Sequence, residues 1–247
     1  MAIHILGGIA KALQLIFAGD PTLYGIVYNS LLFSGVAVIL ATLWGTPIAM
    51  LISLREFRGK NLVKTFFNSL IGIPTVVLGL VLFLAFSNGG PLGFLGLLFT
   101  PGGIIIGEAI LVTPIIVSIA VSAIEAVDPE IMNLAKTLGA SESQASIAVL
   151  KEAANGVLLS NIASFNRAIA ELGVALLVGG NIAGLTDVLT TAISRYTARA
   201  EIDFAIALGI LLMVIVFLIN LGLLIARKVQ VVLTAWGSPH LIGKVSK

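Results

Sequence analysis

A long apolar segment near the N-terminus most constrains what this chain can become. No charged residue occurs between Asp20 and Arg55, and the segment Leu23–Leu54 is predominantly hydrophobic. A helix needs about 20 apolar residues to cross a hydrocarbon layer of about 30 Å. The segment is therefore predicted to span a membrane as a helix.

The composition of the whole chain agrees with a membrane location. Of its 247 residues, 58% are hydrophobic and 11% are charged, whereas soluble domains are about 25% charged. With a mean hydropathy of +1.12 the chain has too little polar surface for a soluble domain, so we expect it to lie in a lipid bilayer. The formal net charge of +2 is too small to suggest a nucleic-acid partner. Without cysteine, the sequence offers no disulfide, thiolate metal site or thiol nucleophile.

Four further segments are long and apolar enough to cross the membrane. The sequence therefore predicts an all-α membrane protein with about five transmembrane helices. The four further spans are predicted at 62–86, 104–124, 157–182 and 202–226.

The N-terminal segment 1–20 is shorter than a span and contains Lys11. Apolar residues recur on one helical face of this segment, namely Ile5, Ile9, Leu13 and Ile16. This pattern predicts an amphipathic helix that lies at the membrane interface. The predicted organisation is an interfacial segment 1–20, a transmembrane domain 21–230 and a cytoplasmic tail 231–247.

Basic residues predict the orientation, because Lys and Arg near the ends of spans tend to stay cytoplasmic. The densest basic cluster is REFRGK at 55–60, directly after the first span. With this loop inside, the polar segment 126–155 and the C-terminus are also inside, and the N-terminus is outside. The uncharged segment 87–103, rich in Gly and Pro, then lies outside. It is either a loop packed closely on the protein or a plain connector.

The polar segment 126–155 has the pattern of two short helices. Asp128 followed by Pro129 is a helix start, and Gly139 is suited to the left-handed conformation that ends the helix. Ser141 with Gln144 has the spacing of a capping box, which begins a second helix. The apolar stripe of the first helix comprises Ile131, Leu134, Ala135 and Leu138. This insert either docks into another protein or lies as a bent amphipathic segment on the lipid surface.

Two stretches resemble a known family. AKTLGAS at 135–141, between the third and fourth spans, resembles the cytoplasmic loop in permease subunits of ATP-binding cassette importers. The family pattern is E-A-A, three residues, G, nine residues and I-x-L-P; Asn133 stands where the pattern has its acidic residue. FNRAIAELGVALLVGGNIAGLTDVLTTAI at 165–193 resembles the oxyanion branch of these permeases, and looks most like the tungstate-type ones.

The resemblance implies the fold of a type I ATP-binding cassette importer permease. It also implies that the insert is a coupling loop, which sits in a cleft of an ATPase subunit and transmits its movement to the spans. The implied coupling residues are Asn133, Leu134, Ala135, Leu138 and Gly139.

The function implied by the resemblance is ATP-driven import of an oxyanion, tungstate in the first place, across the plasma membrane of a prokaryote. The implied assembly is a homodimer with two ATPase subunits and an external substrate-binding protein, for which 187–203 is a candidate contact or else an ordinary solvated loop. The sequence lacks a G-x-x-x-x-G-K-[ST] phosphate loop. ATP and Mg²⁺ are therefore expected on the partner, and this chain is expected to be a transport subunit without catalytic residues, cofactor or metal.

Three alternatives stay open at this point. The first is an ion-coupled secondary carrier for a small anion, and the second is a membrane scaffold without transport. The third keeps the importer but has molybdate or sulfate as its substrate.

Charged and amide side chains within the predicted spans are candidates for the translocation path. Arg167 and Glu171 lie in the fourth predicted span, where charges are costly unless paired or facing water. Their spacing places them on one helical face, as a structural pair or as part of the path. Asn166 and Asn181 either join this lining or bond a neighbouring helix. Glu108 is expected at the membrane interface, near the outer end of the third span.

Overall fold

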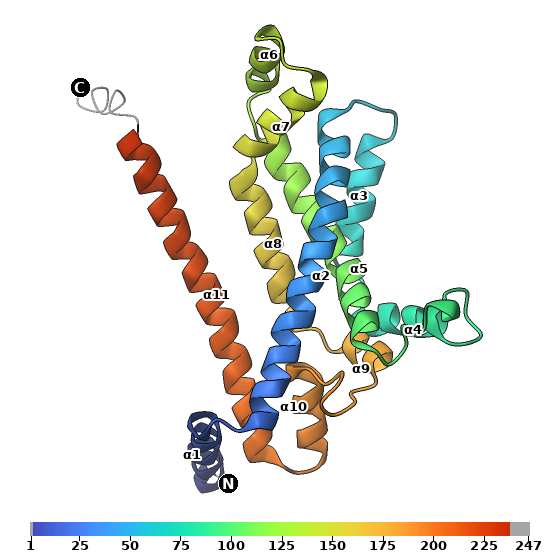
Figure 1. Cartoon of the computed structure of the whole chain (residues 1–247), viewed down its shortest axis with the longest axis vertical. Helices are drawn as coiled ribbons and strands as arrows, with labels where there is room; N and C mark the ends of the chain where they lie inside the picture. The colour runs from blue at the N-terminus through green and yellow to red at the C-terminus, as the bar shows by residue number, and fades with distance from the viewer. Residues whose placement is uncertain (1, 238–247) are drawn as a thin grey trace.

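The computed structural model describes the backbone of residues 2–237 and the side chains of residues 9–222. The described residues form helices and no strands, which confirms the predicted all-α fold (Figure 1). In chain order the helices are α1 (Ala2–Ala18), α2 (Pro21–Leu54), α3 (Lys60–Leu70), α4 (Thr75–Phe86), the 3₁₀ turn η1 (Gly93–Leu95), α5 (Pro101–Glu125), α6 (Pro129–Thr137), α7 (Glu142–Glu152), α8 (Ala154–Ile169), α9 (Gly173–Gly179), α10 (Leu189–Ala198) and α11 (Ile202–Gly237).

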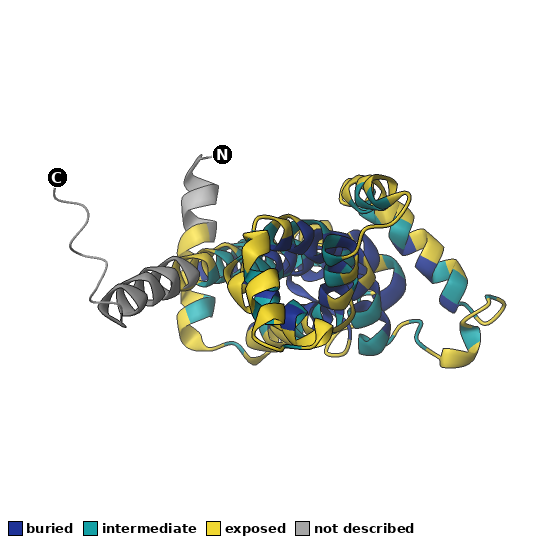
Figure 2. Cartoon of the chain, turned by 90° about the horizontal axis from the view of Figure 1, so that it is seen from above, coloured by how far each residue is buried: buried dark blue, intermediate teal, exposed yellow. Residues whose placement is uncertain are grey.

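Helices α2, α5 and α8 pack together as the central bundle (Figure 1). Alanines lie where these helices meet, among them Ala37, Ala41, Ala109 and Ala168. Small residues let membrane helices approach closely, and close packing rather than exclusion of water holds such helices together. Figure 2 shows the buried residues gathered in the middle of the bundle.

Among the described residues, three helices are long and apolar enough to cross a membrane without a break: α2, α5 and α11. They correspond to the first, third and fifth predicted spans. Helix α11 continues past the predicted end at residue 226 as far as Gly237. The last part of the predicted tail, 238–247, lies outside the described residues.

The second predicted span, 62–86, is not one straight helix. Helices α3 and α4 meet at an angle of 97°, with the break at residues 71–74. Pro74 has no backbone N–H to continue the helix, and it disfavours the helical conformation at Ile73. Helix α4 therefore leaves the bundle sideways (Figure 1).

The fourth predicted span, 157–182, is also bent. Helices α8 and α9 meet at 59° around residues 170–172. Arg167 lies in the last turn of α8 and Glu171 lies in the break, so the prediction that one continuous helix carries both is wrong. Counting each bent pair as one span gives the five predicted spans.

Helix α1 lies beside the start of α11 (Figure 1). Lys11 Nζ is 3.0 Å from Asp203 Oδ2, and Ala12 is buried against α11 and its neighbours. Asp20 then caps α2, because its carboxylate accepts the N–H groups of Thr22 and Leu23. A helix within 1–20 is thus confirmed, whereas its position at the membrane interface stays a prediction.

The segment 87–103 is packed on the protein. The N–H of Leu92 donates to the carbonyl of Ala85 at 2.9 Å, and the N–H of Phe99 donates to the carbonyl of Val178 at 2.8 Å. These bonds attach the segment to α4 and α9. They favour the packed loop over the plain connector.

Candidate coupling surface and membrane-embedded charges

The polar insert forms helix α6, a joint at Gly139 and helix α7, as predicted. The Asp128 carboxylate accepts the N–H of Glu130 at 2.9 Å and so begins α6. Gly139 has a φ of +88°, in the left-handed region that favours glycine. Ser141 and Gln144 exchange the two hydrogen bonds of a capping box and begin α7.

One side of the insert is fixed to the bundle. Ala145, Val149 and Ala153 are buried, and the last two pack in a core cluster with residues of α2 and α5. Ile131 of α6 packs partly against the same cluster. The insert is therefore a continuation of the bundle, at the end opposite α10 (Figure 1).

Further along the apolar stripe that begins at Ile131, the side chains are uncovered. Leu134 is 61% exposed and Leu138 is 80% exposed, while Ala135 is half-buried. Asn133 and Gly139 are also exposed. Large apolar side chains exposed on a polar insert mark a candidate contact with another protein or with the lipid surface. We call Leu134, Leu138 and the half-buried Ala135 the coupling surface.

Arg167 and Glu171 form an ion pair at the bend between α8 and α9. Arg167 Nη1 lies 3.0 Å from Glu171 Oε2. Glu171 Oε1 accepts the N–H of Val174 at 3.0 Å and so caps the start of α9. The hydroxyl of Thr190 donates to the Glu171 carbonyl. Glu171 is 1% exposed, whereas the Arg167 side chain is 35% exposed, so the carboxylate fixes the bend and the guanidinium remains partly accessible.

Glu108 is buried inside the protein, whereas its position at the membrane interface stays a prediction. Helix α5 begins at Pro101, so Glu108 lies about two turns inside the helix. Phe33 of α2 and Val174 of α9 cover these turns, and Glu108 is 1% exposed. Its Oε2 atom has no hydrogen-bond partner among the described residues. Sequence reasoning missed this burial because it depends on where α9 packs.

The two asparagines lie in contacts between segments. Asn166 and Asn220 exchange amide hydrogen bonds of 3.0 and 3.3 Å, which join α8 to α11. Asn181 Nδ2 donates to the carbonyl of Thr191 at 3.2 Å, near the start of α10. The structure thus brings Arg167 and Glu171 together, and it engages both asparagines with neighbouring segments.

Comparison with known proteins assigns the family. A family model described as "Binding-protein-dependent transport system inner membrane component" matches residues 41–230. The chain belongs to this family. The match includes α5 to α10 and the whole insert, and it makes the chain a multi-pass membrane subunit of a transport system rather than an enzyme.

Individual relatives of this inner membrane component support the same family assignment. The chain is 36% identical to the tungstate uptake system permease protein of Peptoclostridium acidaminophilum, over 88% of this chain and 95% of the relative. It is 34% identical to the tungstate uptake system permease protein of Campylobacter jejuni, over 88% and 91%. The solved structure of a bacterial alginate ABC transporter in complex with an alginate pentasaccharide-bound periplasmic protein matches with a TM-score of 0.67 and 19% identity, covering 93% of this chain and 89% of that chain. The predicted type I importer fold is therefore confirmed.

The charged segment 187–203 of this inner membrane component is only partly exposed. Asp187 Oδ2 lies 3.0 Å from Arg195 Nη2, and both side chains are largely buried. Asp203 pairs with Lys11. Arg199 and Glu201 are exposed at the turn between α10 and α11, so part of this segment is structural and part is accessible to solvent.

Glutamine at position 171 is expected to lower thermal stability. Glu171→Gln removes the charge that holds Arg167, and hydrogen bonds to charged groups contribute about 1.5–3 kcal/mol. Because Arg167 is one-third exposed, solvent screening reduces the expected loss to about 1–2 kcal/mol. Thermal unfolding of the purified chain in detergent, followed by tryptophan fluorescence, measures the effect.

Glu108→Gln is the matched control for this experiment. Its Oε2 atom has no partner among the described residues, and an amide has no charge to bury. We therefore expect an unchanged or higher melting temperature. A larger loss for Glu108→Gln than for Glu171→Gln would contradict the role of Glu171 at the bend.

Proposed function

We propose that this chain is the permease subunit of an ATP-driven oxyanion importer whose substrate is tungstate. The observation that carries the proposal is the similarity to tungstate uptake permeases along most of the chain, at 36% and 34% identity. The family match to a binding-protein-dependent system supports ATP-driven import over an ion-coupled carrier.

The proposed assembly has two copies of this chain, two ATP-binding cassette subunits and one external substrate-binding protein. The ATPase subunits hold ATP and Mg²⁺, and the coupling surface meets them on the cytoplasmic side. The basic cluster at 55–60 follows α2 and includes the first residue of α3, and it supports a cytoplasmic position for this end of the bundle. The N-terminus is then outside and the C-terminus inside, in the plasma membrane of a prokaryote.

Transport proceeds by alternating access, in which movement of the ATPase subunits switches the paired spans between outward and inward openings. Arg167 is the proposed attractive group on the path, because its side chain is partly accessible. The Glu171 carboxylate neutralises part of the positive charge of Arg167. This keeps anion binding weak enough for release. Asn166 and Asn181 are proposed to position the segments beside this path.

The test is uptake by the complex purified through a tag on this chain and reconstituted into liposomes with the binding protein. Tungstate, molybdate and sulfate are each offered outside, and the imported metal or sulfur is counted. We expect ATP-dependent uptake, with tungstate preferred, that persists when ionophores collapse the ion gradients. Uptake that needs an ion gradient and no ATPase would establish the carrier instead.

A further inference from the structure

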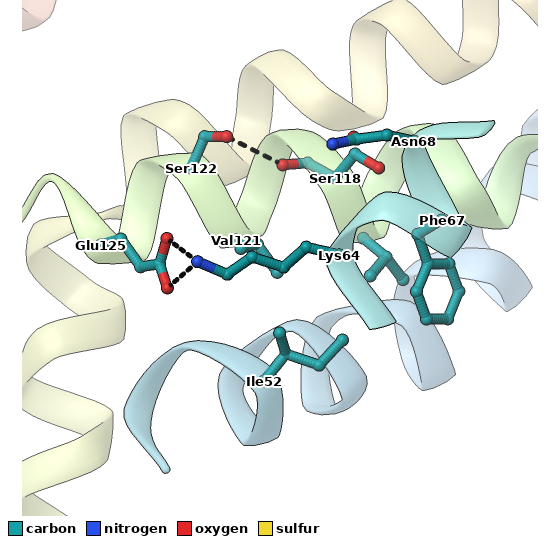
Figure 3. Close-up of a pocket in the computed structure, with 9 residues that line it drawn as sticks. Ile52, Lys64, Phe67, Asn68, Ser118, Val121, Ser122 and Glu125 are labelled. Atoms are coloured by element: carbon teal, nitrogen blue, oxygen red, sulfur yellow. Dashed lines mark hydrogen bonds and ion pairs between the residues drawn. The ribbon is translucent and has the colours of Figure 1, made fainter. Parts of the chain in front are cut away.

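An ionic cluster joins three helices at the end of the bundle that carries the insert. Lys64 Nζ of α3 lies 2.6 Å from Glu125 Oε1 (Figure 3). Lys60 Nζ lies 3.4 Å from the same oxygen. Lys60 also binds Glu56 at 2.9 Å and donates to the carbonyl of Ser53 at the end of α2. A single carboxylate on α5 therefore holds two lysines, one helical turn apart on α3.

The remaining contact between α3 and the bundle is loose. None of the described residues of α3 is buried, although Val63 and Phe67 pack partly against the core. A cavity of about 230 Å³ lies between α3 and α5, and Figure 3 shows Phe67, Asn68 and Ser118 around it. The hydroxyl of Ser118 has no hydrogen-bond partner among the described residues. Loose packing of this kind leaves the ionic cluster as the main attachment of α3 to the end of α5.

The position of Glu125 links this attachment to the insert. Glu125 is the last residue of α5, and α6 begins at Pro129. On the other side, α3 continues through the 97° bend into α4. Helix α4 lies directly on α9, because a Cβ at Gly79 would come within 2.8 Å of the Gly173 carbonyl oxygen. Two contacts, Glu125 with α3 and α4 with α9, and two short backbone connections, 126–128 and 71–74, thus link α6 to α9.

We propose that Glu125 is a positioning residue for transport: it couples movement of the insert to α3, and through α3 to α4 and α9. The proposal rests on the ATP-driven import proposed above. Part-exposed ion pairs contribute little to folding stability. The proposed role of this cluster is therefore to position α3 on α5, not to stabilise the fold. Because one carboxylate serves both lysines, removing its charge releases α3 more completely than removing either lysine.

The experiment measures how many tungstate ions the reconstituted complex imports per ATP hydrolysed. We expect Glu125→Gln to lower this ratio at least fivefold, while ATP hydrolysis and assembly persist. Lys64→Met should lower it less, because Lys60 still binds Glu125. The matched control is Lys11→Met, which removes the interhelical pair with Asp203 at the other end of the bundle and should leave the ratio unchanged.

Exchanging the charges of Glu125 and Lys64 distinguishes a loss of coupling from a loss of folded structure. The double variant Glu125→Lys with Lys64→Glu restores an ion pair between α3 and α5, and it should recover at least half of the wild-type ratio. An equal ratio for Glu125→Gln and Lys11→Met would overturn the role of Glu125. Loss of melting temperature and uptake together, without recovery in the exchange variant, would overturn it as well. Failure of the wild-type complex to import tungstate with ATP would instead refute the proposed function.

Discussion

Replacing Leu134 and Leu138 together by aspartate is expected to abolish ATP-driven uptake without unfolding the chain. Both side chains project away from the bundle, at 61% and 80% exposure, so the fold does not depend on them. In the assembly they would be covered by the ATPase, where two carboxylates would be buried without partners. Loss of a central apolar contact costs 2 kcal/mol or more in many interfaces, which corresponds to at least about 30-fold weaker binding.

The measurement is copurification of the ATPase with the tagged chain, followed by uptake. The double variant with methionine at both positions is the matched control, since it keeps an apolar surface of similar volume. We expect the methionine variant to retain the ATPase and the aspartate variant to lose it, with equal melting temperatures for the two permeases. Full uptake by the aspartate variant would show that the partner binds elsewhere.

A side chain at Gly173 is expected to separate α4 from α9 and so destroy transport. A Cβ at this position would lie 2.7 Å from the N atom of Val76 and 2.9 Å from the carbonyl carbon of Thr75. These neighbours are backbone atoms and cannot change rotamer to make room. Overpacking of this kind costs about 1–3 kcal/mol in protein cores, and Gly173→Val should reach the upper part of that range.

Gly35→Ala is the control for the glycine variants, because a Cβ there meets nothing within 4 Å. Alanine is also the better helix former, so this variant should be neutral or stabilising. Gly173→Ala should fall between the control and Gly173→Val in both melting temperature and uptake. A Gly173→Ala variant as stable and active as Gly35→Ala would show that the α4–α9 contact can open without consequence.

The short-range features of the fold were predictable from the sequence. The caps at Asp128 and Ser141 and the joint at Gly139 depend on hydrogen bonds and backbone angles within a few residues. The apolar positions Leu134 and Leu138 were predictable for the same reason, since helical spacing alone places them on one face.

The bends depend on information that hydropathy does not contain. A window of apolar residues measures whether a segment can lie in lipid, and a bent helix pair passes that test as well as a straight helix. Pro74 was a visible signal for the first bend, whereas the second contains no proline and is held by Glu171 and Thr190. Because Thr190 lies in α10, 19 residues after Glu171, that bend depends on a tertiary contact. The burial of Glu108 has the same origin.

The contact between Gly79 and Gly173 has a genetic consequence. A large residue in a core is often rescued when a neighbouring side chain becomes smaller, but here each glycine faces the backbone of the other segment. No residue is smaller than glycine, so neither position can compensate for a change at the other. Revertants selected from a Gly173→Val strain should therefore carry a restored glycine codon. We expect both positions to remain glycine in functional variants of the membrane domain.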